Sequence, residues 1–318
     1  MSVGMMCGLC GSSSYAIVRD SVRHDIKRKV LRCGQCNFVY LEPLEQVGPD
    51  YYSGQDYRQR HGPTINQTAN CQEIFNTYYP FQKDIIGEIE TILRPDMKVL
   101  DVGCSTGHFL AALKGKVGER VGMEFNRDEV DFIRHNLDFK VYSEPIEQLV
   151  MPEGPFDLIT ALQVLEHVDH PLTFIKNLMK HLKPGGHLYL ELPNINDPLL
   201  EYYQVPGYDD FYFREPHLSY FSVRTLRRLL DQAGLAGPIK TVQRYNFLNH
   251  LHWKFTNQPQ GNFVIGNSDP VLVATTGGDA AVKQDLNDFI KRTDEEYKKI
   301  IIKHGLGESL TFLGKKVS

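Results

Sequence analysis

The sequence lacks several features that would place it in a special class of protein. No stretch approaches the ~20 consecutive apolar residues that a membrane-spanning helix needs. The opening residues, MSVGMMCGLC, have no basic segment followed by an apolar one, so we expect no secretory signal, no membrane partner and a cytoplasmic location. The formal net charge is only -4, which gives no general attraction to nucleic acid.

Cysteine is scarce, yet it is concentrated near the N-terminus. Four of the six cysteines form two C-x-x-C pairs, which in a reducing compartment favours metal ligation over disulfides. Two such turns joined by a hairpin about 22 residues long can present four thiolates to one tetrahedral zinc ion. We therefore predict a structural zinc ribbon over residues 1–42 that needs the metal to fold. Its predicted ligands are Cys7, Cys10, Cys33 and Cys36.

Two other interpretations of this N-terminal unit stay open. Four reduced cysteines could pack in a small apolar core, and a zinc ribbon can bind nucleic acid. The basic cluster over residues 27–32 is short, and such a cluster is more often a solvated face. We therefore do not expect nucleic acid as a partner.

The centre of the chain contains a strand, a glycine-containing turn and a helix in succession. An apolar strand leads into the turn DVGCSTG over residues 101–107, and a helical run follows over residues 108–114. Glycine at both ends lets the backbone approach a ligand closely. A second short strand over residues 121–123 ends at Glu124, where an acidic side chain can accept both hydroxyls of a ribose. This order predicts a nucleotide site at one edge of a parallel sheet.

Two other motifs share letters with this turn. A nicotinamide-binding turn would read G-x-G-x-x-G, but residues 103–108 lack the second and third glycine at that spacing. The turn also reads G-x-S-x-G, the nucleophile elbow of α/β-hydrolases, in which Ser105 would attack an ester. That fold needs several strands before the elbow, whereas residues 60–96 indicate helix and loop. Both alternatives are therefore disfavoured.

The turn and the segments after it resemble class I S-adenosylmethionine-dependent methyltransferases. Strands, helices and glycine stops alternate at the spacing of that family over residues 97–194, although the family usually has glycine where Ser105 stands. The resemblance implies an α/β fold with a Rossmann-like seven-stranded core and S-adenosylmethionine as the cofactor. The last two strands, over residues 239–247 and 271–275, would form an antiparallel pair at the sheet edge.

The resemblance also implies which side chains hold the cofactor. Glu124 would bind the ribose, and Glu144 with Ile146 would contact the adenine. Leu162 and Gln163 would lie beside the methionine part, and Tyr57 would close the site from above. The predicted set is Tyr57, Asp101, Gly103, Cys104, Ser105, Gly107, Glu124, Phe125, Glu144, Ile146, Leu162 and Gln163.

An insertion over residues 195–222 follows the fifth strand and is rich in aromatic and polar residues. Rings stack on sugars while polar groups orient hydroxyls, so we expect a wall of the acceptor pocket here. Its segment EPHLSYFS, residues 215–222, resembles one in bacterial methyltransferases from sugar and surface-glycan pathways, some of which also carry a zinc ribbon. In the deoxysugar C-methyltransferases a glutamate directly precedes the histidine, whereas here Pro216 intervenes. The sequence therefore favours O- or N-methylation.

A hydroxyl acceptor must lose a proton as the methyl group arrives. His217 is the predicted general base, because histidine has a reference pKa of about 6.5. Glu215 would orient its ring, and Tyr220 would hold the acceptor. Three histidines stay open as alternative bases: His167, His250 and His252.

The chain is thus predicted to contain four segments. They are a zinc ribbon over 1–42, a linker and helical lid over 43–96, the methyltransferase core over 97–276, and a C-terminal helical tail over 277–318. The tail is expected to self-associate or to pack at the sheet edge. The protein is expected to be a monomer or a homodimer. The expected function is methyl transfer to a small molecule, namely a sugar or nucleotide-linked sugar in glycan or natural-product biosynthesis. The alternative function is that of a zinc-ribbon module that binds RNA or a protein, with the second domain as a cofactor-bound platform. An RNA methyltransferase would combine features of both functions.

Overall fold

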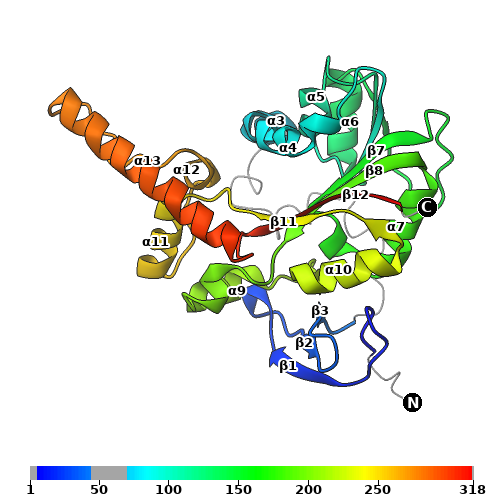
Figure 1. The fold of residues 1–318 in the computed structure, drawn as a ribbon, viewed down its shortest axis with the longest axis horizontal. Coiled ribbons are helices and arrows are strands. Elements are labelled where there is room, and N and C mark those ends of the chain that lie inside the picture. The colour runs from blue at the N-terminus through cyan, green and yellow to red at the C-terminus, as the bar shows by residue number, and fades with distance from the viewer. Residues whose placement is uncertain (1–5, 44–69, 317–318) are drawn as a thin grey trace.

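A computed structural model of the protein describes residues 6–43 and 70–316, and the structural statements below concern these residues. A central sheet carries helices on both faces, the N-terminal ribbon lies against one side of this layered core, and C-terminal helices project as an arm (Figure 1). Within the described part of the chain, no helix is long and apolar enough to cross a membrane.

The central sheet has eight strands that fill seven positions. Its order is β6, β5, β4, β7, β8 and β12, and both β10 and β11 pair with β12 at the far edge. The five strands from β6 to β8 are parallel, whereas β12 is antiparallel to β8. β10 and β11 share one edge position because they pair with different ends of β12. The bounds are β4 Lys98–Val102, β5 Glu119–Met123, β6 Lys140–Tyr142, β7 Phe156–Leu162, β8 Leu182–Pro193, β10 Leu235–Ala236, β11 Ile239–Val242 and β12 Ser309–Lys316.

The helices of the core follow from local capping signals and apolar spacing. Asn126 caps α6 by accepting a hydrogen bond from the backbone of Glu129, and Ser222 forms a capping box at the start of α10. Leu226, Leu229 and Leu230 of α10 are buried at helical spacing, so this helix turns one face to the sheet. The bounds are α3 Cys71–Tyr78, α4 Gln82–Ile89, α5 His108–Ala112, α6 Arg127–Asn136, α7 Pro171–Lys180 and α10 Val223–Gln232.

The apolar strand β4 is buried on both faces. Its consecutive residues Val99 and Leu100 are fully buried in two different apolar clusters, one on each side of the sheet. A parallel strand covered on both faces reads as a continuous apolar run, because neither side faces water. The prediction of a Rossmann-like α/β core with a parallel-rich sheet is therefore confirmed.

The prediction of a last strand over residues 271–275 was wrong. That segment has no regular structure, and Val271 and Leu272 are exposed. The position is filled by β12, which comes from the segment predicted as a helical tail. Leu310 and Phe312 of β12 are fully buried because the strand lies between β8 and β11. The core sheet therefore extends well beyond the predicted boundary at residue 276.

The N-terminal ribbon and the insertion share one sheet. The ribbon strands are β1 Tyr15–Arg19, β2 Val30–Cys33 and β3 Val39–Leu41. β9 (Ser219–Tyr220) of the insertion adds to this sheet by antiparallel pairing with β3. Arg28 donates to the backbone carbonyl of Glu215, and Arg19 forms ion pairs with two aspartates of helix α9 (Pro206–Tyr212). The ribbon and the insertion therefore form one structural unit.

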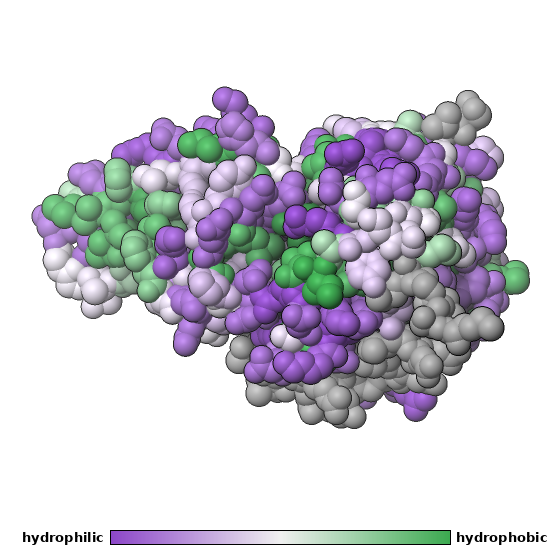
Figure 2. Space-filling model, turned by 90° about the horizontal axis from the view of Figure 1, so that it is seen from below, coloured by the Kyte–Doolittle hydropathy of each residue, from purple (hydrophilic) through white to green (hydrophobic). Residues whose placement is uncertain are grey.

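The C-terminal arm contains the helices that precede β12. Its bounds are α11 Phe247–Thr256, α12 Phe263–Asn267 and α13 Ala280–Lys303, and the short helix α8 (Pro198–Glu201) packs beneath α11. Apolar residues gather at the arm's end of the molecule (Figure 2). The exposed apolar side chains of these helices include Phe255, Ile265, Leu286 and Phe289.

Candidate functional site

A cavity of about 870 Å³ opens at the carboxyl ends of β4, β5 and β7. Ligands of open parallel sheets bind at this edge, where strand order reverses. One half of the cavity is lined by the glycine-containing turn and the strand ends, and the other half by the insertion and the ribbon. A larger groove of about 1410 Å³ lies between α4, β11 and α13, and it shares Phe81, Arg244 and Asn267 with the wall of this cavity.

The glycine-containing turn adopts a backbone that glycine favours. Gly103 and Gly107 have φ angles of 73° and 77°, and a Cβ atom there would lie 2.5 and 2.7 Å from neighbouring side chains. Ser105 also has a positive φ, of 50°, at the position where the resembled family usually has glycine. Its backbone N–H donates to the carboxylate of Glu124 at 2.8 Å, which ties the turn to the end of β5.

Two acidic side chains at the strand ends face this half of the cavity. Glu124 accepts hydrogen bonds from three backbone N–H groups, those of Ser105, Phe125 and Asn126, at 2.8 to 2.9 Å. Asp101 is buried and accepts a hydrogen bond from the Thr160 hydroxyl at 2.6 Å. Burial raises the pKa of Asp101 to about 7, and the nearby charge of Glu124 adds to this effect.

The structure brings most of the predicted cofactor residues to the cavity wall. They are Asp101, Gly103, Cys104, Ser105, Glu124, Phe125, Ile146, Leu162 and Gln163. Gly107 starts helix α5 behind the wall. Glu144 is exposed and absent from the lining, and its carboxylate accepts from the backbone of Ser143, whereas Glu147 does line the cavity. Tyr57 lies outside the described residues.

His217 lines the other half of the cavity and is 4% exposed. Its Nε2 atom is in hydrogen-bond contact with the guanidinium of Arg214. Because a guanidinium only donates, this nitrogen accepts and the ring carries no proton there. The ring of His167 stands perpendicular to that of His217, with 4.8 Å between the ring centroids. In this hydrogen bond the ring is oriented by Arg214, the residue next to the predicted partner Glu215.

Glu166 lines the cavity, although the sequence alone did not indicate it. It lies on the 3₁₀ turn η5 (Leu165–His167), is 1% exposed, and neither carboxylate oxygen has a hydrogen-bond partner among the described residues. One oxygen lies 3.8 Å from Nε2 of His167, and burial raises the pKa of Glu166 to about 8. Its position beside a histidine just after a strand end was the signal available in the sequence.

The side chains of Glu166, His167 and His217 form a compact cluster, which we call the acid–imidazole cluster. Their ligand atoms lie within 4.8 Å of one another, as metal ligands do. Arg214, however, donates to Nε2 of His217, the lone pair that a metal ion would need. A guanidinium also repels a cation electrostatically. The surroundings therefore favour proton transfer over metal binding in this cluster.

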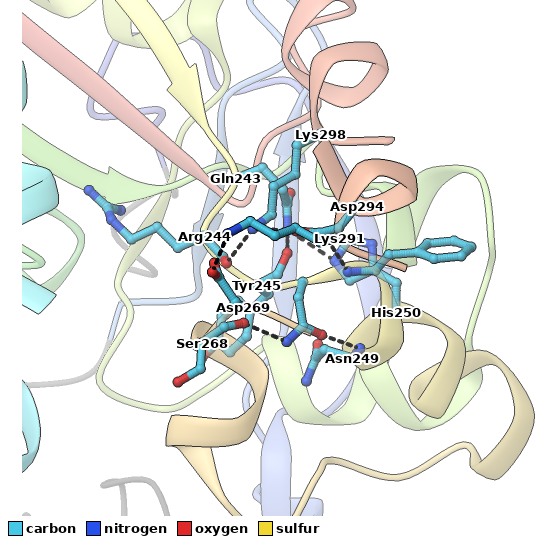
Figure 3. Close-up of polar contacts among 12 residues, drawn as sticks. Gln243, Arg244, Tyr245, Asn249, His250, Ser268, Asp269, Lys291, Asp294 and Lys298 are labelled. Atoms are coloured by element: carbon cyan, nitrogen blue, oxygen red, sulfur yellow. Dashed lines mark hydrogen bonds and ion pairs between the residues drawn. The ribbon is translucent and has the colours of Figure 1, made fainter. Parts of the chain in front are cut away.

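Two predicted catalytic residues lie away from the cavity. The Tyr220 hydroxyl accepts from the backbone N–H of Arg214 at 2.9 Å and donates to its carbonyl at 3.2 Å, so it holds the loop in place. His250 lies buried on α11, in the polar network that Figure 3 shows. Its ring contacts Gln243 and Tyr297 at 3.2 and 2.6 Å, and burial lowers its pKa to about 4. Neither side chain lines the cavity in which the predicted base His217 lies.

The four N-terminal cysteines converge as the spacing predicts. The Sγ atoms of Cys7 and Cys36 lie 3.6 Å apart, those of Cys10 and Cys33 lie 3.5 Å apart, and none of them forms a disulfide. Four sulfurs around one zinc ion at Zn–S distances of about 2.3 Å would be separated by roughly 3.8 Å. The donor set and its dimensions therefore fit a tetrahedral Cys₄ zinc site.

Sequence comparison identifies relatives for the central part of the chain. A family described as "Methyltransferase domain" matches residues 76–237, just over half of the chain. The ubiquinone biosynthesis O-methyltransferase of Aliivibrio fischeri (strain MJ11) is 28% identical over 167 residues, covering 49% of this chain and 70% of that protein. The protein of the same name from Vibrio parahaemolyticus is 27% identical over 181 residues, covering 53% and 75%.

Solved structures are similar over a larger part of the chain but at low sequence identity. A SAM-dependent methyltransferase from Archaeoglobus fulgidus has a TM-score of 0.49 and 18% identity, covering 77% of this chain and 97% of that one. An S-adenosylmethionine-dependent methyltransferase from Clostridium acetobutylicum has a TM-score of 0.44 and 12% identity, covering 83% and 98%.

Proposed function

Since the chain belongs to the methyltransferase-domain family, it is an S-adenosylmethionine-dependent methyltransferase, and we propose that it methylates a hydroxyl group of a small molecule. The proposal extends to a sugar or nucleotide-linked sugar as the acceptor. Its main support is the second half of the cavity, which is lined by Tyr208, Phe211 and Tyr212 of the insertion. Aromatic walls of this kind stack on sugars and bases. The names of the curated relatives favour oxygen over nitrogen or carbon as the methylated atom.

The residues at the strand ends suit the cofactor. The carboxylate of Glu124 lies at the end of β5, and three backbone N–H groups hold it in place. Of its roughly four acceptor positions one stays open to a ribose hydroxyl, and a second hydroxyl would replace the N–H of Ser105 at Oε2. Phe125 and Ile146 offer apolar surface for the adenine ring. When bound, the cofactor supplies a methyl group on a positively charged sulfur, and the protein aligns the acceptor with it.

We place the proton acceptor in the acid–imidazole cluster. His217 remains the proposed base, and the acceptor hydroxyl would replace Arg214 at its Nε2 atom. Above its raised pKa, Glu166 carries a carboxylate that would stabilise the imidazolium that forms, because the two groups are buried side by side and charges attract more strongly away from water. We thus propose that Glu166, instead of Glu215, stabilises the charged ring of His217.

A panel of sugars and nucleotide-linked sugars, assayed with methyl-labelled S-adenosylmethionine, tests the acceptor class. With the acceptor identified in this way and at saturating cofactor, the variant His217→Gln should turn over more slowly by a factor of about 10² to 10⁴. The matched control is His304→Gln, which changes an exposed histidine and should stay within a few-fold of the parent. Intact turnover in His217→Gln with normal cofactor binding would contradict its role as base. Methylation of another class of molecule, with none of the panel accepted, would exclude the sugar acceptor.

A further inference from the structure

An arginine of the zinc ribbon reaches the acceptor half of the cavity. Arg23, in the 3₁₀ turn η1 (Arg23–Asp25), lines the cavity although the ribbon is far from the strand ends in sequence. Its guanidinium lies over the ring of Phe211, 4.3 Å from the ring centroid. Its NH1 atom is buried and has no hydrogen-bond partner among the described residues. A buried cationic donor without a partner is costly, so this group is prepared for a ligand.

Arg214 of the insertion lines the same cavity. Burial lowers the pKa of Arg23, and the charge of Arg214 lowers it further, which means that the two guanidinium groups repel each other. No carboxylate among the described residues offsets this repulsion at Arg23. The carboxylate of Glu191, which also lines the cavity, is already bound by both terminal guanidinium nitrogens of Arg244, at 2.6 and 2.8 Å.

The turn that carries Arg23 is fixed on the insertion. Its backbone N–H donates to the carbonyl of Phe213 at 2.7 Å. The next two residues, His24 and Asp25, have φ angles of 66° and 56°, a conformation that L-residues adopt at a cost. Val22 and Ile26 pair across the base of the turn. The side chain of Arg23 is therefore held over α9 instead of extending into solvent.

We propose that Arg23 and Arg214 together bind a phosphoryl group of the acceptor, so that the zinc ribbon takes part directly in acceptor recognition. Two guanidinium groups carry two positive charges, which a phosphate or diphosphate balances and a single carboxylate does not. Guanidinium forks also match the oxygen spacing of phosphate. This inference rests on the proposed function and narrows its acceptor to a phosphorylated or nucleotide-linked molecule.

Calorimetric titration of the zinc-loaded full chain, in the presence of S-adenosylhomocysteine, tests the proposal. The probes are inorganic pyrophosphate, uridine diphosphate and, as a carboxylate of sugar size, glucuronate. We expect the two phosphates to bind, more weakly as salt is added, and glucuronate to bind at least tenfold more weakly. Arg23→Gln should weaken both phosphates tenfold or more. Arg32→Gln, the same change at an exposed ribbon position, should bind as the parent does.

Several outcomes would overturn the proposal. They are failure of both phosphates to bind the parent, equal binding of glucuronate, or equal losses in Arg23→Gln and Arg32→Gln. Unchanged zinc content and cofactor affinity, measured on the same samples, would show that Arg23→Gln is folded. Arg23→Lys should retain part of the phosphate binding because it keeps the positive charge. Methylation of an uncharged acceptor by a parent chain that binds no phosphate would refute this inference alone. Phosphate binding without any methylated hydroxyl acceptor would instead refute the proposed function.

Discussion

Glu124 and Glu166 share one cavity but have opposite surroundings. Three backbone N–H groups donate to Glu124, whereas no hydrogen-bond donor reaches Glu166 within the described part of the chain. A carboxylate fixed by donors is suited to hold hydroxyl groups of a ligand. A buried carboxyl group with a raised pKa is suited to exchange protons. At the scale of the residue, these surroundings suit Glu124 to its proposed role in cofactor binding and Glu166 to its proposed role in proton transfer.

Glu124→Ala is expected to weaken S-adenosylmethionine binding by on the order of tenfold or more. Hydrogen bonds to a charged acceptor contribute roughly 1.5 to 3 kcal/mol, and this variant removes the proposed ribose contact. Glu144→Ala serves as the matched control, because that carboxylate is exposed and does not line the cavity. Calorimetric titration would contradict the assignment if both variants bound the cofactor like the parent.

Glu166→Gln is expected to stabilise the protein increasingly as the pH rises. The pKa of Glu166 is raised from an ordinary 4.5 to about 8 in the folded chain. Between these values the folded chain keeps a proton that the unfolded chain has lost, so the parent loses stability with rising pH, by up to about 1.4 kcal/mol per pH unit. The variant lacks this dependence. Urea unfolding at pH 5.5 and pH 8 checks it, and a difference from the parent that does not change with pH would refute the raised pKa.

At the scale of the element, β12 is the strand on which the sheet edge depends. It pairs with β8 on one side and with β10 and β11 on the other, so among the described strands these two edge strands join the sheet through β12 alone. Its chain segment follows α13, and the arm therefore connects two strands that lie side by side. Loss of packing in β12 should consequently affect the whole core.

Phe312→Ala is expected to destabilise the protein by about 3 to 5 kcal/mol, because it empties a fully buried aromatic position. Phe289→Ala on α13 is the control, since that ring is 56% exposed, and its effect should stay within about 0.5 kcal/mol. Chemical unfolding of both variants gives the comparison. Equal stability of the two variants would show that β12 does not form part of the folded core.

At the scale of the whole molecule, the cavity is assembled from two units that are distant in sequence. The strand ends of the core line one half, where we propose that the cofactor binds, and the joined ribbon and insertion line the other, which is the proposed acceptor half. The cysteine cluster lies in the ribbon, and Gln232 of the core helix α10 donates to the backbone carbonyl of Leu9 between two of these cysteines, at 3.0 Å. The metal should therefore matter for one half of the cavity only.

Elemental analysis of protein purified without added metal should find about one zinc per chain. Cys33→Ser should lose the zinc and the methylation of the acceptor, while S-adenosylmethionine affinity changes by less than about threefold, because the ribbon does not build the cofactor half. Cys71→Ser, outside the cluster, should keep all three properties. A folded, metal-free parent would contradict the zinc site, and equal loss of cofactor binding in Cys33→Ser would contradict the division into halves.

The sequence by itself determined the features that depend on neighbouring residues. The turn over residues 101–107 and the bounds of α6 follow from local spacing and capping, and the cysteine pairs were recognisable from their intervals. These signals are local because backbone conformation and caps are set within a few residues. The α/β class then follows from the alternation of strands and helices.

Only the tertiary structure decided which distant segments meet. β12 was mistaken for part of a tail, since a short apolar run does not reveal its pairing partner. Glu144 and Glu147 lie only three positions apart in the sequence, and the tertiary structure decides which of them lines the cavity. Arg23 and Glu166 became candidates because the structure buries polar atoms of both side chains without a hydrogen-bond partner among the described residues. Burial and long-range pairing are properties of the packed chain, and no local pattern specifies them.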